Sequence, residues 1–560
     1  MMDNIAKAKA IFRSPAVGAV IRWSKCVHGR LLLICAMNTA VTLLSLSETM
    51  ATKELIDGAV SGRKDALLLW GGCVIAITLI NRALYAGLSL TRVSASSRLQ
   101  RSMQSMVARR LLSREYAGLK GYHSGEMVNR FFSDVGTVRG GVMSLLPSLI
   151  STAVSFIGAA AILISMDWRF VPLLILAGCL GLGIVLLFRN PMKRRHKRMQ
   201  EEEDSLHSIV QETLENLRLV KASLSENRFA RLIGLRQEGL RREQVRQGRF
   251  STLMNNGMGL VFDLSWLFCM LWGCFSISNG LLTYGALAAI IQLIGRIQGP
   301  IANAVGLAAE AYGVVASAER LQELVDLPEE EAGEPLSSFD EIRLEGVCFR
   351  YEDGDTVLDH IDCVFRRGSF TALTGISGGG KTSLFQLLLG IYQPTEGRVV
   401  FCSDGEDVVA SRATRALIAY VPQGNTLFSG TLRDNLTMFT DGASDEAVFQ
   451  AARIACIDDL LGEIGLDAVV GERGVGLSEG QAQRVAVARA LLTDAPILLL
   501  DECTSALDEE TEAKLLQNLS SLREKTCVIV THRRAALSIC DRTLHIADGR
   551  LEEKEGQTGE

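Results

Sequence analysis

The sequence of 560 residues has no CxxC pair and no cluster of cysteine and histidine at zinc-site spacing, although it contains 13 cysteines. These absences argue against a disulfide framework and favour reduced thiols in apolar cores and lipid-facing helices. The net charge is only -5 at pH 7, which is too small to indicate a nucleic-acid partner. The first apolar run lacks a small-residue cleavage site, so we expect it to be retained as a membrane span.

Long apolar runs fill the first part of the chain, whereas the remainder has the composition of a soluble α/β domain. Six runs come close to the roughly 20 residues that a bilayer core requires. They cover residues 31–50, 66–88, 145–166, 170–188, 258–277 and 280 to about 305. The pattern predicts a membrane domain of six helices that precedes a soluble domain.

The gaps between the apolar runs alternate in length. The gaps after the second and fourth runs are long and rich in arginine and lysine, and basic loops stay on the cytoplasmic side. Both long gaps, both termini and the soluble domain are therefore predicted to be cytoplasmic. The gaps have helical apolar spacing without Pro-rich or Gly-rich linkers, so we expect helical hairpins that reach a docked soluble domain.

Four ionisable residues lie within or at the edges of the predicted spans, namely Glu48, Arg82, Asp263 and Arg296. Charged groups are costly in a bilayer and usually face a cavity or one another. The sequence leaves both readings open: these side chains line a transport pathway, or they form salt bridges and span boundaries.

An acidic, turn-rich stretch at residues 328–338 indicates a linker. We therefore expect a membrane domain at residues 1–325, a linker at 326–340 and a soluble domain at 341–560. The soluble domain starts with alternating apolar residues, as expected of a strand.

A strand predicted at residues 369–373 leads into a glycine-rich loop and then into an apolar helix at 384–389. The loop and the first residue after it are Gly375, Ile376, Ser377, Gly378, Gly379, Gly380, Lys381, Thr382 and Ser383. Glycines allow backbone N–H groups to surround phosphates, while the lysine reaches the β and γ phosphates and the threonine hydroxyl can bind Mg²⁺. The pattern predicts a nucleoside triphosphate site.

A second apolar run, residues 497–500, ends in Asp501 and Glu502. Such a run is typical of a strand buried in a parallel sheet, whose carboxyl edge is where ligands bind. We expect Asp501 to bind Mg²⁺ and Glu502 to polarise the attacking water, since phosphoryl transfer depends on positioning and charge neutralisation.

Together with these two motifs, a segment formed by Leu477, Ser478, Glu479, Gly480 and Gln481 resembles the signature of the ATP-binding cassette of ABC transporters. The resemblance extends to Tyr351 in the adenine-stacking loop, Gln423 in a glutamine loop that meets Mg²⁺, Asp508 in the D-loop and His532 as the switch histidine. It also covers residues 470–474, which resemble a loop that touches coupling helices, and residues 122–126 and 217–221, which look like coupling regions. The ordered motifs and the six runs identify the chain as a half-size exporter.

The resemblance implies ATP and Mg²⁺ as cofactors and a second half-transporter subunit, identical or different, as partner. It implies ATP-driven export of a small molecule, lipid or peptide through alternating access, with the signature serine facing ATP held by the other subunit. An ATP-gated channel or sensor, an exporter-fold importer, and a soluble ATPase with a membrane anchor are the alternatives. Glu479 stands where the family has glycine, and we expect its side chain to point away from the phosphates.

Overall fold

The computed structural model describes residues 14–554, except residues 123, 168, 170, 332, 352, 353, 472 and 473, the side chain of residue 124 and several side chains within 171–196 and 300–309. The chain divides into two compact units. One consists of residues 1–112 and 124–326, and the other of residues 113–123 and 327–560. The short segment 113–123 thus groups with the second unit, although it lies between two helices of the first.

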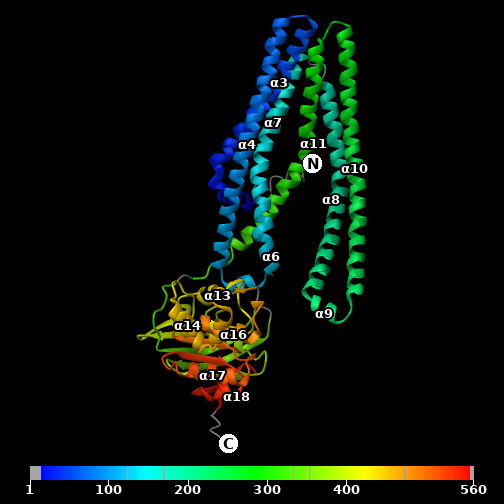
Figure 1. Ribbon diagram of the computed structural model, residues 1–560. Coiled ribbons are helices and arrows are strands. Elements are labelled where there is room, and N and C mark those ends of the chain that lie inside the picture. Colours follow the sequence, from blue (N-terminus) through cyan, green and yellow to red (C-terminus); the bar gives the residue numbers. More distant parts are fainter. Residues whose placement is uncertain are drawn as a thin grey trace. The chain divides into compact units, whose positions relative to one another are not determined.

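The first unit consists of helices (Figure 1). Its main helices are α2 (Pro15–Trp23), α3 (His28–Val60), α4 (Lys64–Leu112), α6 (Ser124–Asn129), α7 (Val135–Met166), α8 (Val171–Glu215), α9 (Leu217–Ala222), α10 (Glu226–Ser278) and α11 (Tyr284–Val325). Helices α8 and α10 run side by side and are joined at one end by the short helix α9, which makes the second predicted hairpin helical.

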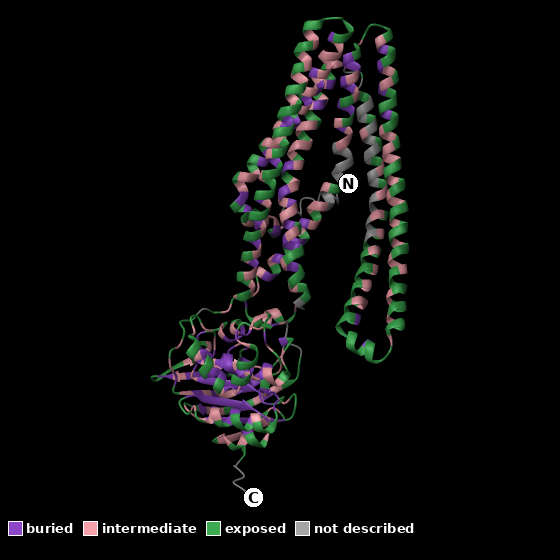
Figure 2. Ribbon diagram, in the orientation of Figure 1, coloured by how far each residue is buried: buried purple, intermediate pink, exposed green. Residues whose placement is uncertain are grey.

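Among the described residues, four helical stretches are long and apolar enough to cross a membrane. They are Pro15–Val60, Lys64–Leu112, Gly125–Met166 and Glu226–Ser278, and they contain four of the six predicted spans. The predicted span at 170–188 overlaps α8 from Val171, and the one at 280–305 overlaps α11 from Tyr284. Part of the side chains in both stretches lies outside the described residues. Many residues of the first unit are exposed (Figure 2). They include apolar side chains such as Leu68, as expected of helices that face lipid.

Close helix packing in the first unit depends on small residues. A Cβ atom on Gly141 of α7 would lie 2.0 Å from Cγ2 of Val314 in α11, and one on Gly273 of α10 would lie 2.2 Å from Cδ1 of Leu287 in α11. Small residues let transmembrane helices approach closely enough for backbone contact. These glycines therefore set the separation between α11 and its neighbours.

The four ionisable residues singled out in the spans have different environments. Glu48 of α3 is half-buried, and its Oε1 accepts a hydrogen bond of 3.3 Å from the Thr78 hydroxyl of α4. Arg82 and Asp263 are exposed and Arg296 is half-buried. Glu48 therefore contributes to a polar contact between two helices.

The second unit contains two main sheets. An antiparallel sheet has the order β2 (Thr356–Arg366), β1 (Glu341–Arg350), β4 (Glu396–Ser403), β5 (Glu406–Val409). A mostly parallel sheet has the order β12 (Arg550–Lys554), β11 (Arg542–Ala547), β3 (Phe370–Gly375), β10 (Thr526–Val530), β9 (Ile497–Asp501), β6 (Ile418–Val421). A short pair joins β7 (Gly430–Thr431) to β8 (Val469–Val470).

Helices accompany these sheets in the second unit. They include α5 (Tyr116–Lys120), α12 (Lys381–Leu388), α13 (Leu432–Thr437), α14 (Asp445–Ile454), α15 (Asp458–Ile464), α16 (Glu479–Leu492), α17 (Glu509–Ser520) and α18 (Arg534–Ser538). Every residue of β9 and β10 is buried, which explains their unbroken apolar sequences. The buried core of this unit is concentrated around the sheets (Figure 2).

Candidate functional site

Four neighbouring parallel strands, β3, β10, β9 and β6, end at the same edge of the sheet. Val530 of β10 pairs with Leu373 on one side and with Asp501 on the other, and Leu500 pairs with Val421 of β6. The strand ends therefore bring together the glycine loop, His532, the pair Asp501 and Glu502, and Gln423. Ligands of open α/β sheets bind at this edge.

The glycine loop, residues 375–382, has backbone conformations that only glycine adopts easily. Gly375, Gly378 and Gly380 have φ values of 146°, 81° and 100°. A Cβ atom on Gly375 would lie 2.4 Å from the carbonyl oxygen of Ile546, and one on Gly380 would lie 2.8 Å from Cδ2 of Leu358. The sequence motif is thus a geometric requirement of this loop.

Lys381 begins α12 and is buried beneath the loop. Its Nζ donates hydrogen bonds to the carbonyl oxygens of Gly375 (2.7 Å) and Ile376 (3.0 Å), so the ammonium group is held inside the curve of the loop. Ser377 and Thr382 are exposed and Gly379 is half-buried at its rim. A positive charge held at the start of a helix suits an anion such as phosphate.

Thr382 and Asp501 provide oxygen atoms suited to a hard cation. The Thr382 hydroxyl donates a hydrogen bond of 3.2 Å to Oδ2 of Asp501, which is buried at the end of β9. Burial raises the pKa of the Asp501 carboxyl, because the charged form loses solvation. A nearby divalent cation would compensate this cost, and hydroxyl and carboxylate oxygens are ligands that Mg²⁺ prefers. The residues present therefore fit Mg²⁺.

Glu502 is held in a strained backbone conformation next to Gln423. Its φ is 51°, in the left-handed region that non-glycine residues rarely adopt, and its N–H donates to the carbonyl oxygen of Val530 (3.1 Å). Nε2 of Gln423 donates a hydrogen bond of 2.7 Å to Oε2 of Glu502. Such strain costs about 1–3 kcal/mol and concentrates at functional sites. His532 follows β10 directly and is exposed at the same edge.

Tyr351 lies in an aromatic cluster at the end of β1. Its hydroxyl is 3.0 Å from Oγ of Ser383 and donates to Oε1 of Gln386 (3.1 Å), which connects it to the helix that follows the glycine loop. Its ring makes edge contacts with Tyr392, and Nζ of Lys120 lies 3.8 Å from the ring centre. The predicted adenine-stacking residue is thus fixed beside the phosphate loop.

The signature segment, residues 477–481, forms the start of α16. Ser478 and Gln481 make a reciprocal capping box: Oγ of Ser478 accepts from the N–H of Gln481 (3.2 Å), and the side chain of Gln481 accepts from the N–H of Ser478 (2.8 Å). Leu477 packs against the apolar core, whereas Ser478 and Glu479 are exposed. A Cβ atom on Gly480 would lie 2.8 Å from the carbonyl oxygen of Ala506, so this glycine permits close contact with the D-loop.

Two residues that sequence reasoning did not assign to the site hold the D-loop, residues 503–508. Gln483 of α16 donates to Oγ of Ser505 (3.0 Å) and accepts from the N–H of Ala506 (3.2 Å). Arg533 donates to the carbonyl oxygens of Ser505 (2.7 Å) and Leu507 (3.0 Å). The only sequence signal for Arg533 is that it follows His532.

Asp508 lies at the start of α17, and parts of the predicted coupling segments lie outside the described residues. Asp508 caps α17, with Oδ1 accepting from the N–H of Thr511 (2.9 Å), and this hydrogen bonding lowers the pKa of its carboxyl. Residues 472 and 473 of the predicted coupling-helix loop and residue 123 of the first predicted coupling region lie outside the described residues.

Comparisons with known proteins agree with this geometry. A model of the ABC transporter transmembrane region matches residues 31–301, and a model of the ABC transporter ATPase family, described as "ABC transporter", matches residues 358–505. A multidrug resistance ABC transporter ATP-binding and permease protein of Lactococcus lactis subsp. cremoris is 30% identical over 443 residues, which are 76% of this chain and 74% of that protein.

A mycobactin import ATP-binding/permease protein of Mycobacterium bovis is 39% identical over 285 residues, which are 49% of each chain. The solved structure of a bacterial Atm1-family ABC exporter with ATP bound has the same fold, with a TM-score of 0.80, 24% identity, and coverage of 94% of this chain and 95% of that one. The fused helical and ATPase domains, the ATP site and these relatives together show that the chain is an ATP-hydrolysing membrane transporter of the ABC family, of the exporter type.

Proposed function

We propose that this chain is one half of a dimeric ABC exporter in which two cassettes bind two ATP molecules between them. The observation that carries the proposal is the nucleotide site itself, where Lys381, Asp501, Glu502 and Gln423 meet at one sheet edge on the same chain as the membrane helices. Because these groups are all present, the subunit has the residues needed for hydrolysis as well as for binding.

Each residue of the site has a defined task in this proposal. Lys381 neutralises the β and γ phosphates, and Thr382, Asp501 and Gln423 hold Mg²⁺, which neutralises charge on the phosphates when bound. Glu502 accepts a hydrogen bond from the attacking water, and His532 contacts the γ-phosphate. Tyr351 stacks on adenine, and the D-loop with Asp508 lies between the two cassettes.

The exposed start of α16 supports a shared site. Ser478 combines an exposed hydroxyl with a helix N-terminus, and such an end favours an anion. In the dimer, residues 477–481 of one chain would contact the γ-phosphate held by the glycine loop of the other. Glu479 is also exposed in the first turn, where its charge stabilises the helix dipole.

Transport then follows from alternating access in the dimer. ATP-dependent closure of two cassettes would be transmitted to the helices through the coupling regions, and hydrolysis would reset them. Leu219 of α9 is 67% exposed, and Leu224, two residues beyond the end of α9, is 86% exposed. These side chains form an apolar tip suited to docking onto an ATPase domain. The proposed arrangement keeps both termini and the ATPase domain (341–560) in the cytoplasm, with the membrane domain (1–325) and linker (326–340) before it.

A small molecule, a lipid or a peptide is the proposed cargo. Because a relative is a mycobactin importer, import by the exporter fold is the second candidate, and an ATP-gated channel is the third. One relative is named for multidrug resistance and another for mycobactin import.

Transport in inside-out membrane vesicles distinguishes these possibilities. An exporter takes up its cargo from a panel of peptides, lipids and dyes when ATP is supplied outside, and uptake stops in the Glu502→Gln variant. ATP-driven release of preloaded cargo from the same vesicles would instead establish import. Flux that follows the cargo gradient and persists in the Glu502→Gln variant would establish a channel and contradict coupled pumping.

A further inference from the structure

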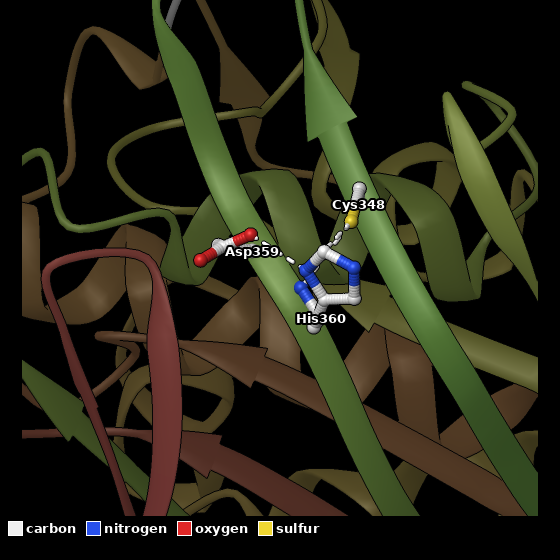
Figure 3. Close-up of side chains that lie close together, drawn as sticks. All are labelled: Cys348, Asp359 and His360. Carbon is white, nitrogen blue, oxygen red and sulfur yellow. Dashed lines mark hydrogen bonds and ion pairs between the residues drawn. The ribbon is translucent and has the colours of Figure 1, made fainter.

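Cys348, Asp359 and His360 lie together on two neighbouring strands of the antiparallel sheet, outside the nucleotide site (Figure 3). Strand β1 pairs with β2 through Val347 with Ile361 and through Phe349 with Leu358. Cys348 is therefore opposite two residues, Asp359 and His360, in a β-bulge. Bulges redirect side chains, and here the bulge turns two polar side chains toward one cysteine.

The polar atoms of the three side chains converge on a small volume. Nδ1 of His360 lies 3.5 Å from Sγ of Cys348 and 2.7 Å from Oδ1 of Asp359, and one potential ligand atom from each residue lies within 4.8 Å of the others. The backbone N–H of His360 also donates to Sγ of Cys348 (3.3 Å), which stabilises negative charge on the sulfur. His360 has a φ of 49°, in the left-handed region, so its backbone is strained at this position.

The arrangement differs from a cysteine-histidine-aspartate nucleophile. In such a relay the two partners contact opposite nitrogens of the imidazole, whereas both Cys348 and Asp359 contact Nδ1 of His360. Donor atoms that meet at a single point suit a cation placed between them.

We propose that Cys348, Asp359 and His360 form a binding site for a divalent transition metal ion of the zinc class. Tetrahedral zinc has bonds of about 2.3 Å to sulfur and about 2.0 Å to nitrogen, which separate these ligands by about 3.5 Å. The Cys348–His360 separation already has this value. The His360–Asp359 separation must widen to about 3.3 Å when the shared proton is replaced by the ion, which a small rotation of an exposed side chain allows.

Water completes the coordination, because His360 is exposed and one side of the cluster faces solvent. Arg550 contacts the other oxygen, Oδ2, at 3.4 Å and leaves Oδ1 for the ion. The positive charge of Arg550 weakens binding of the cation, so we expect a lower affinity than that of a zinc site with four protein ligands.

Metal binding would affect the nucleotide site through the backbone. Strand β1 ends at Arg350, and Tyr351 follows it directly. An ion that ties Cys348 to β2 therefore restrains the strand pair that carries the adenine-stacking ring. We expect bound metal to restrain Tyr351 and to change the affinity for ATP without altering the phosphate-binding residues.

Cobalt titration of the full-length protein in lipid nanodiscs tests the site, because a cysteine thiolate bound to Co²⁺ gives a near-ultraviolet charge-transfer band. One equivalent per chain should produce this band, Zn²⁺ should abolish it, and the Cys348→Ser and His360→Ala variants should lack it. Cys402→Ser is the matched control, since Cys402 lies half-buried on β4 of the same sheet.

A second measurement separates metal binding from misfolding of the variants. Zinc should raise the thermal unfolding temperature of the wild type and of Cys402→Ser, and should leave that of His360→Ala unchanged while the metal-free variant retains ATP hydrolysis. A cobalt band that persists in both Cys348→Ser and His360→Ala, or the lack of any band in the wild type, would overturn the proposal.

Discussion

The backbone conformation of Glu502 orients its carboxylate. Its left-handed conformation is stabilised by two backbone hydrogen bonds, one to Val530 and one from Ser505 (each 3.1 Å), and its carboxylate is held by Gln423. The carboxylate is thereby oriented before any nucleotide binds. Orientation and charge supply most of the catalysis in phosphoryl transfer.

We expect Glu502→Gln to retain ATP binding and to lose hydrolysis by at least about 100-fold, since the amide no longer accepts a proton or polarises water. The variant should accumulate as an ATP-bound dimer. Steady-state ATPase activity and nucleotide retention of purified protein measure both effects. Unchanged steady-state hydrolysis would refute the role given to Glu502.

Arg533 connects the end of β10 to the D-loop and to α17. Its guanidinium donates to the carbonyl oxygens of Ser505 and Leu507 and to Oε2 of Glu512 (2.8 Å), and Glu512 is only 3% exposed. Because His532 directly precedes it in the sequence, Arg533 restrains the position of His532 relative to the D-loop. It acts as a positioning residue.

Replacing Arg533 by Gln should lower the kcat of ATP hydrolysis by roughly tenfold, or about 1.4 kcal/mol, while the KM for ATP stays close to that of the wild type. Arg533→Lys should restore part of the rate because a cation still balances Glu512. Arg534→Gln is the control, since Arg534 is exposed beside it. A lower unfolding temperature with an unchanged kcat would show that Arg533 is only structural.

At the scale of elements, local patterns predicted the strands and the loop that build the nucleotide site. The apolar run before Asp501 forms the fully buried strand β9, and the strand, glycine loop and helix around Lys381 are β3, residues 375–380 and α12. Strand pairing was not predictable in this way. The bulge opposite Cys348 depends on the register between β1 and β2, and adjacent residues in the sequence carry no signal for it.

Helix packing in the membrane unit gives a prediction at the same scale. Gly141→Ala should destabilise the unit, because the new methyl group meets the stiff side chain of Val314 and overpacking costs about 1–3 kcal/mol. Gly140→Ala is the matched control: its Cβ would meet no atom within 4 Å, and alanine favours helix by about 1 kcal/mol. Thermal unfolding in detergent measures both variants, and equal unfolding temperatures would contradict the packing argument.

At the scale of the whole molecule, the proposed shared ATP sites require two chains. A heterodimer of one Lys381→Ala chain and one Ser478→Ala chain contains one composite site with both defects and one site with none. We therefore expect heterodimers isolated with two different tags to hydrolyse ATP faster than either homodimeric variant, yet slower than the wild type.

The two variants alone provide the controls for this experiment. Each homodimer carries the same defect in both sites and should be nearly inactive. Heterodimer activity equal to that of the wild type, or no higher than that of the homodimers, would contradict sites shared between chains.

The sequence by itself determined that apolar helices precede an α/β domain and that a glycine-rich loop lies between a strand and a helix, because hydrophobic length, glycine spacing and buried strands are local properties. Only the tertiary structure decided which residues from distant elements contact these helices and loops. Gln483 and Arg533 meet the D-loop, Gly141 meets Val314, and Cys348 meets His360 only after distant elements pack together. Such contacts depend on register and helix separation, which the whole fold fixes and no single segment encodes.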